Sequence, residues 1–424
     1  MKPKLAQAVV DSLSFSNEEF GRADFDQFSQ RDWQRTLPWL HDNGIALYFL
    51  QKLKNVNAGS AIPLPVLACL EESLAANRQR VSRLATQFEQ LNRNFDQAGV
   101  VYAAVKGLTL VPEFCPEPYL RHQSDFDYLV ADESLPRACR ALEHAGYELS
   151  THSARDCVFR LPSDGFVPTV YNQYSADAPH TVELHLSLWD SNAYDIFLVE
   201  PGFCVDRTVN YPRGRSTFCG LREEDHFLFM VAHVFYHISS YWLRLSWLYE
   251  IAYFLNRRAT DTLLWTRVEQ CMGDDPALHE IVALVTTLAT HFFAVPMPPT
   301  MEAWPLRPSV RVWIQHYARV WAFGKNQATN FSLLPTAKLT LFLLQHYVPD
   351  PKRFIWSRLV PSTRLANIAH TLRSDPERIL DKQFRRRERI ARRAIFHLTA
   401  NLRYICERPR WGRLNKLAAR SSAI

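Results

Sequence analysis

Apolar residues follow a helical period in the first hundred positions of the chain. The clearest stripe runs with spacings of seven, three, four, three and four through Leu74, Val81, Leu84, Phe88, Leu91 and Phe95. Residues at these spacings share one face of a helix, and Gly99 follows as a typical end signal. The pattern predicts a long helix over about residues 71–98, within a helical N-terminal region.

The pattern changes to that of strands between residues 99 and 220. Short runs rich in β-branched and aromatic residues indicate strands, and the turn between residues 161 and 167 indicates a hairpin. The strands are predicted at VVYAAV (100–105), SDFDYLV (124–130), DCVFRL (156–161), VPTVYNQY (167–174) and HTVELHLSLW (180–189). Residues 132–147 between them have a helical period that ends at Gly146.

Helical periodicity returns after about residue 222. We therefore predict an α+β fold, in which a small mixed sheet lies between N-terminal and C-terminal helical regions. The predicted regions are 1–98 (helical), 99–220 (core), 221–350 (helical) and 351–424 (basic helical tail). The apolar run at 281–296 is short for a membrane span and contains Thr and His, so we interpret it as a buried helix.

Composition and cysteine use narrow the class of protein. The chain has 424 residues, is 47% hydrophobic and 22% charged, and has eight cysteines, none in a CxxC pair. The first twenty residues contain acidic side chains and no apolar segment typical of a signal peptide. We expect reduced thiols, neither disulfides nor a zinc site, and a cytoplasmic location.

The net charge of +6 hides an asymmetry along the chain. Residues 352–424 hold 19 Lys and Arg against 5 Asp and Glu, so the remaining chain is mildly acidic. The tail has three open interpretations: a solvated charged helix, a nucleic-acid contact, or an amphipathic helix at an anionic membrane surface. Apolar residues alternate with the arginines, which suits the last, and we expect a cytoplasmic or membrane-peripheral protein.

Candidate chemistry begins with the acids of SDFDYLV. Asp125 and Asp127 are two residues apart on a predicted strand, so their side chains leave the same face. They either line a solvated rim of the sheet or share a metal ion. A third strand acid, Glu183, favours the metal, because three converging carboxylates can hold one or two Mg²⁺ ions.

Three further residues could contact phosphate. Lys106 and Gly107 stand at a predicted strand-to-helix junction, where a glycine lets backbone N–H groups approach a triphosphate. Arg121 precedes Asp125 by four residues and could grip a phosphate with its guanidinium. Lys106 could equally be a surface lysine, and Arg121 could instead pair with Asp125 or Asp127.

The ordered set VKGLTL, YLRHQSDFDYLV, ACRALEHAGY and VELHLSL resembles the nucleotidyltransferase superfamily with the DNA polymerase β-like fold. It is most similar to a poorly characterised bacterial branch, and the resemblance covers roughly residues 30–260. It implies that Asp125, Asp127 and Glu183 bind two metal ions and that Lys106 and Gly107 hold the nucleoside triphosphate (NTP). The chain departs from the general pattern in having Leu108 where a serine is usual.

Histidines and a later helix add weaker candidates. His185 is either a structural group beside the acids or a ligand. His233 and His237 share a helix face but are not followed by the glutamate of a zinc motif, so we interpret them as packed histidines. Arg244 and Glu250 lie either at the substrate cleft or on a helix surface.

The resemblance implies transfer of a nucleotidyl group from an NTP to an acceptor, with Mg²⁺ as cofactor. The acceptor is a small molecule or a protein, and the sequence names neither it nor the NTP. The alternative is a catalytically silent binding or scaffold protein with the same fold, in a surface-glycan or peptide-modification pathway. Mg²⁺-dependent NTP binding discriminates between them.

Overall fold

The computed structural model describes most of the chain and divides it into two compact units. Unit 1 contains 1–190, 198–236 and 243–305, and unit 2 contains 191–197, 237–242 and 306–424. The predicted boundaries at 98, 220 and 350 remain predictions. The described residues are 2–16, 25–153, 156–162, 166, 169, 172–187, 207–213, 216–240, 243–302, 304, 306–323, 336–360 and 379–421, with the side chains of 302, 379–393 and 421 left out.

One mixed sheet forms the centre of unit 1. Its strand order is β3-β4-β5-β2-β1-β7-β6. The strands are β1 (Tyr102–Val105), β2 (Asp125–Val130), β3 (Glu148–His152), β4 (Asp156–Arg160), β5 (Thr181–His185), β6 (Thr208–Arg213) and β7 (Ser216–Leu221). The β2–β5 and β1–β7 pairs are parallel and the other pairs are antiparallel. The α+β prediction is confirmed.

The predicted hairpin is wrong in its partner. Strand β4 pairs antiparallel with β3 on one side and β5 on the other, with Asp156 opposite His185. The segment 167–174 lies partly outside the described residues, and its residues 172–174 form a turn. The apolar alternation of 156–161 does specify a strand, but alternation alone does not select which neighbour pairs with it.

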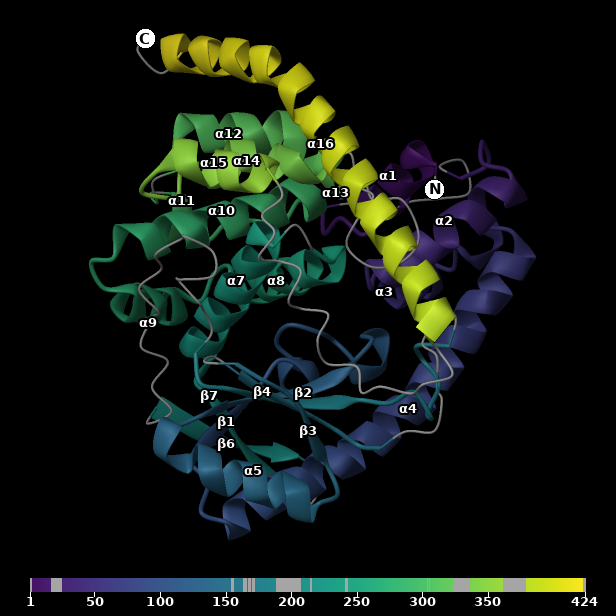
Figure 1. Cartoon of the computed structure of the whole chain (residues 1–424), viewed down its shortest axis with the longest axis vertical. Coiled ribbons are helices and arrows are strands. Elements are labelled where there is room, and N and C mark those ends of the chain that lie inside the picture. The colour runs from purple at the N-terminus through teal and green to yellow at the C-terminus, as the bar shows by residue number, and fades with distance from the viewer. Residues whose placement is uncertain are drawn as a thin grey trace. The chain divides into compact units, whose positions relative to one another are not determined.

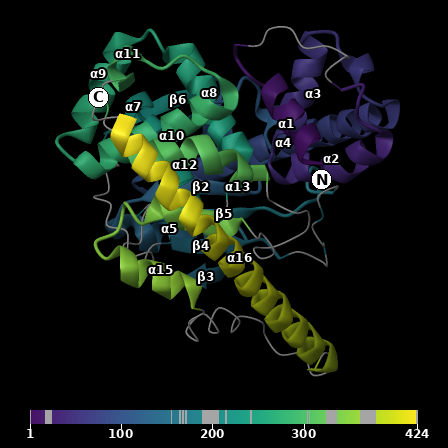
Figure 2. The same ribbon diagram turned by 90° about the horizontal axis from the view of Figure 1, so that it is seen from above.

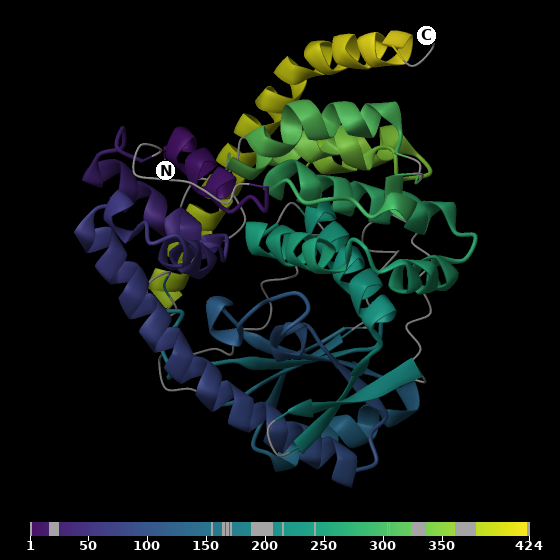
Figure 3. The same cartoon turned by 180° about the vertical axis from the view of Figure 1, so that it is seen from behind.

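Helices α4 (Leu64–Gln97) and α5 (Leu135–His144) cover one face of the sheet (Figures 1 and 3). The predicted stripe on α4 is confirmed and packs on this face. Phe88 lies with ring centroids 5.7 Å from Phe126, 6.1 Å from Tyr128 and 5.5 Å from Phe218. These residues belong to the core cluster together with Val182 and Leu184 of β5. The sheet therefore has one fully apolar face.

The described part of unit 1 contains eight further α-helices. They are α1 (Pro3–Ser12), α2 (Gln30–Asp42), α3 (Ala46–Asn55), α7 (Glu223–Ser239, ending in unit 2), α8 (Leu245–Arg258), α9 (Thr262–Met272), α10 (Pro276–Phe293) and α11 (Pro299–Glu302). Figure 1 shows α7 and α8 on the side of the sheet opposite α4 and α5. Helix α10 is long and apolar enough to cross a membrane, but 67% of that stretch is buried in the protein, which fits the predicted buried helix.

Unit 2 is helical in its described part. It contains α12 (Pro308–Trp313), η7 (Ile314–Ala318), α13 (Arg319–Phe323), η8 (Ala337–Thr340), α14 (Leu341–Leu344), α15 (Pro351–Leu359) and α16 (Ile379–Ser421). The long α16 is drawn as the yellow ribbon in Figure 2. Aromatic stacking of Phe342 on Tyr404 (4.6 Å) and on Trp411 (5.1 Å) fixes α16 against α14.

Candidate metal and nucleotide site

Strand register brings the predicted acids together. In the parallel β2–β5 pair, Asp127 lies opposite Glu183, and in the antiparallel β1–β2 pair it lies opposite Val105. Because side chains alternate along a strand, Asp125, Asp127 and Glu183 point away from the face that holds Phe126 and Tyr128. The acids therefore share the face opposite α4.

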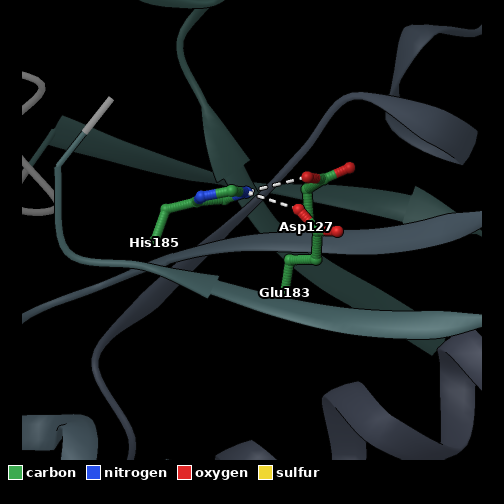
Figure 4. Close-up of side chains that lie close together, drawn as sticks. All are labelled: Asp127, Glu183 and His185. Atoms are coloured by element: carbon green, nitrogen blue, oxygen red, sulfur yellow. Dashed lines mark hydrogen bonds and ion pairs between the residues drawn. The ribbon is translucent and has the colours of Figure 1, made fainter. Parts of the chain in front are cut away.

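His185 completes a tight group with two of these acids. Asp127, Glu183 and His185 each offer one ligand atom, and these three atoms lie within 4.8 Å of one another. The part of the chain that the structure describes contains no other group of three possible metal ligands. The His185 Nε2 lies 2.8 Å from Asp127 Oδ1 and 3.8 Å from Glu183 Oε2 (Figure 4). His185 is thus a direct neighbour of the acids, and the ELH spacing was its only signal in the sequence.

Lys106 reaches the same carboxylate from the end of β1. Its ammonium Nζ lies 2.5 Å from Asp127 Oδ1, and both side chains are buried. The backbone of Lys106 has φ +56°, a conformation that costs a non-glycine residue about 1–3 kcal/mol. Val105, the residue before it, is paired with Asp127, so the Lys106 side chain reaches the neighbouring strand. Lys106 is therefore no plain surface lysine, and in this structure it neutralises an acid.

Charge and burial shift the pKa values of the group in opposite directions. Burial raises the pKa of Asp127, but Lys106 and His185 outweigh it and leave this pKa well below its usual range. Burial, with the charges of Asp127 and Asp125, raises the pKa of Glu183 to about 8. Burial lowers the pKa of Lys106, yet the three carboxylates outweigh it and raise this pKa. The group thus combines a firmly ionised carboxylate with one that holds its proton near neutral pH.

Asp125 lies in a region rich in cations. Burial and the neighbouring charge of Asp127 raise its pKa, against the opposing charges of Lys106, Arg121 and Arg244. Arg244 precedes α8 and is half-buried. The predicted alternatives for Arg244 were a place near the substrate or on a helix surface, and its charge acts on Asp125.

Arg121 pairs with neither Asp125 nor Asp127 but with Glu250. Its Nε lies 2.9 Å from Glu250 Oε1, and the Glu250 side chain is fully buried in α8. The Tyr48 hydroxyl donates to the same oxygen at 3.3 Å. The pair fastens the segment before β2 to α8, so Glu250 has a structural contact. Sequence reasoning could not find this contact, because Arg121 and Tyr48 precede Glu250 by 129 and 202 positions.

Gly107 is required by a neighbour that sequence reasoning missed. It has φ +50°, and a Cβ there would lie 2.5 Å from the amide nitrogen of Gln123. That amide donates to the backbone oxygen of Asp125 at 3.0 Å. Buried Arg80 on α4 in turn donates to the backbone oxygen of Gln123. Gly107, Gln123 and Arg80 therefore set the position of the β2 strand entry.

The remaining candidates fit packing roles. His233 lies edge-on to Trp247 with centroids 5.1 Å apart, in agreement with the prediction of a packed histidine. The seven cysteines within the described part of the chain are free thiols, as predicted, and Cys204 lies outside it.

Comparison with known families places this site in context. A model of an uncharacterised nucleotidyltransferase family matches residues 29–294. The chain belongs to this family. No curated protein and no solved structure matches the chain. The matched segment contains the whole sheet and all the acids above, and most of it belongs to unit 1.

The donor set of the chain fits a divalent cation. The carboxylates of Asp127 and Glu183 converge with one imidazole, Asp125 lies on the same face of the sheet, and a buried ammonium offsets part of their charge. Oxygen donors are those that Mg²⁺ prefers. Converging buried carboxylates are costly unless a cation balances them, so the arrangement is consistent with metal binding.

Proposed function

We propose that the chain transfers a nucleotidyl group from an NTP to an acceptor in a Mg²⁺-dependent reaction. One observation carries this proposal: within the family region, strand register gathers Asp125, Asp127 and Glu183 on one face beside Lys106. General transfer chemistry follows from the family, and the metal and the residue roles are part of the proposal.

Asp125, Asp127 and Glu183 would hold the metal, with two ions as the expected number. His185 would fix the orientation of Asp127 through its 2.8 Å contact. When bound, Mg²⁺ would offset the charge of the triphosphate and orient it for displacement.

Lys106 and Gly107 would serve the nucleotide. The Lys106 ammonium lies 2.5 Å from Asp127 Oδ1, and it would contact a triphosphate oxygen. The backbone at Gly107 would contribute N–H groups to the same phosphates. Arg121 was predicted to grip phosphate, but its Nε is held by Glu250, so we assign it to positioning the strand entry of Asp125.

The reaction would proceed by displacement at the α-phosphorus of the NTP. The acceptor oxygen forms a bond to this phosphorus, the bond to the bridging oxygen breaks, and pyrophosphate leaves with the electron pair. Glu183 would accept the acceptor proton in its ionised form; it lies opposite Asp127 in the β2–β5 pair and is half-buried. The acceptor is a small molecule or a protein.

Calorimetric titration of the full chain with each NTP, with and without Mg²⁺, tests the proposal. We expect Mg²⁺-dependent binding in the micromolar range that is lost in Asp125→Asn/Asp127→Asn. Asp132→Asn is the matched control, because it removes an exposed acid just after the same strand. The preferred NTP then directs the search for an acceptor.

Two outcomes would contradict the proposal. Absence of NTP binding by a chain with a cooperative unfolding transition would favour the catalytically silent scaffold in a surface-glycan or peptide-modification pathway. Binding that survives in the double variant would move the nucleotide away from these acids. Lys106→Met separates nucleotide binding from metal binding. It should weaken NTP binding while leaving the binding of Mn²⁺, used in place of Mg²⁺, intact.

A further inference from the structure

Helix α16 in unit 2 has two unlike long faces. One face packs on unit 2 through Ala400, Tyr404 and Glu407, all buried. Tyr404 stacks on Phe342, and Glu407 accepts from the Tyr317 hydroxyl at 3.3 Å. These contacts fix the rotation of the helix about its own axis, and they therefore determine which residues lie on its opposite face.

The opposite face carries an exposed apolar stripe. Ile395, Leu398, Leu402 and Ile405 are 53%, 62%, 54% and 58% exposed. Their spacings of three, four and three place them on one side of the helix, away from the positions of Ala400 and Tyr404. Four large aliphatic side chains in a row on one exposed face mark an interaction surface.

Basic residues continue this face toward the C-terminus. Arg413, Lys416 and Arg420 are exposed and recur at helical spacing from Leu402 and Ile405. Arg408 is exposed beside the stripe. None of these four makes an ion pair with an acidic side chain in the described residues. Over its whole length α16 has thirteen Lys and Arg against three Asp and Glu, so the apolar stripe lies in a strongly positive helix.

Helix α15 adds apolar groups next to α16. The Asn401 side chain donates to the backbone oxygen of Leu359 at the end of α15, at 2.9 Å. This end carries Trp356, which is 69% exposed, and Val360, which is 44% exposed. Tryptophan is enriched where a protein meets the interface of a membrane.

We propose that this surface of unit 2, formed by the α16 stripe and its basic continuation, binds an anionic lipid surface. Apolar side chains on one helix face with cations along it are the pattern of an interfacial helix: the aliphatic groups enter the lipid boundary and the cations contact anionic headgroups. The proposal does not depend on the nucleotidyltransferase activity.

A second copy of the chain is the main alternative occupant, and the stripe is too short for it. The four apolar residues fill two heptads in the pattern of a coiled coil, whereas a stable one takes three or four. The next core position is Pro409 and the one after is Gly412. Positive charge on neighbouring turns would also repel a second identical helix.

Flotation of the full chain with vesicles tests the proposal. We compare vesicles of phosphatidylcholine alone with vesicles that also contain phosphatidylglycerol. Leu398→Gln/Leu402→Gln should reduce partitioning onto the anionic vesicles by about tenfold or more. The matched control is Leu64→Gln/Leu263→Gln, which alters two leucines of unit 1 that are 76% and 64% exposed and should leave partitioning unchanged. Arg413→Gln/Lys416→Gln/Arg420→Gln should lower partitioning and its dependence on salt.

Each other outcome overturns the proposal. Lack of partitioning by the unaltered chain excludes a lipid surface of this composition. If both leucine double variants lose vesicle partitioning equally, the loss does not depend on the position of the leucines in α16. A dimer that disappears in Leu398→Gln/Leu402→Gln, together with no vesicle binding, assigns the stripe to a second copy. Circular dichroism and NTP binding of each variant establish that the chain is folded and that the lipid result is separate from the nucleotide site.

Discussion

The two faces of the central sheet differ in what they do for the protein. On the face toward α4, Phe126 and Tyr128 pack on Phe88 in an aromatic core. On the other face, from the alternate positions of the same strand, Asp125 and Asp127 meet Glu183 and Lys106. One six-residue strand therefore supplies both the packing and the candidate chemistry.

The difference shows how a strand can carry buried charge. The aromatic face gains stability from the area it removes from water, which offsets the cost of placing carboxylates opposite it. The acidic face depends on pairing, because each buried carboxylate needs a cation such as Lys106 or Arg121 nearby. Perturbing the aromatic face should affect the free energy of unfolding alone, whereas perturbing the acidic face should affect both binding and the free energy of unfolding.

Removing the central aromatic side chain breaks the apolar face most strongly. Phe88→Ala should lower the free energy of unfolding by about 3–5 kcal/mol, because it deletes the ring that touches Phe126, Tyr128 and Phe218. Urea titration measures the loss. Mn²⁺ binding by the remaining folded protein should be unchanged, and a parallel loss of Mn²⁺ affinity would show that the faces are not independent.

The second largest effect should come from the pair that holds the acidic face to α8. Glu250→Gln leaves the buried Arg121 guanidinium without its carboxylate, which should cost about 3 kcal/mol of unfolding free energy. Asp177→Asn is the control: it breaks the exposed pair with Arg83, at 84% exposure of the acid, and should cost less than about 1 kcal/mol. Equal effects of the two changes would refute the structural role of the Arg121–Glu250 pair.

A histidine at the apolar face gives a pH test. His180 packs on Phe126 and contacts the Tyr147 hydroxyl at 2.8 Å, and burial lowers its pKa to about 4. The unfolded chain binds this proton near pH 6.5, so the folded state loses stability as pH falls from about 6.5 to about 4, by about 1.4 kcal/mol per pH unit for this group. In His180→Asn, the slope of unfolding free energy against pH should be smaller by one proton over that window. An unchanged slope would mean that His180 is protonated in the folded protein.

Sequence patterns predicted the site better than they predicted its supports. The i, i+2 spacing of Asp125 and Asp127 and the alternation around Glu183 depend only on the two-residue period of strands, so the face that they share could be read directly. Arg80, Gln123 and Glu250 support that face through contacts between distant segments. No local pattern encodes such contacts, and a buried arginine inside a helical stripe looks like a solvated residue.

For the fold, too, local patterns were predicted from the sequence and contacts between distant segments were not. The long period of α4 and the strands β1, β2 and β5 were predicted, because each has a strong local pattern. Strands β6 and β7 were missed: Pro212 and Gly220 interrupt them, and both residues are typical of turns or sheet edges. The pairing of β4 with β5 was also missed, since pairing depends on which strands meet in three dimensions.

The smallest expected effect has opposite signs at the two aspartates of β2. The pKa of Asp125 is raised by burial and by Asp127, so its charge opposes folding at pH 7. The pKa of Asp127 is lowered because Lys106 and His185 outweigh burial, so its charge favours folding. In EDTA, Asp125→Asn should raise the free energy of unfolding by about 1 kcal/mol, as expected where a functional residue is held at a cost to stability. Asp127→Asn should lower the free energy of unfolding, because Lys106 then lies buried without its closest carboxylate.

The control is Asp132→Asn at an exposed position, which should change the free energy of unfolding by less than about 0.5 kcal/mol. If both substitutions lower the free energy of unfolding, both carboxylates stabilise the fold. The distinction between a structurally paired acid and one retained for binding a cation would then be wrong.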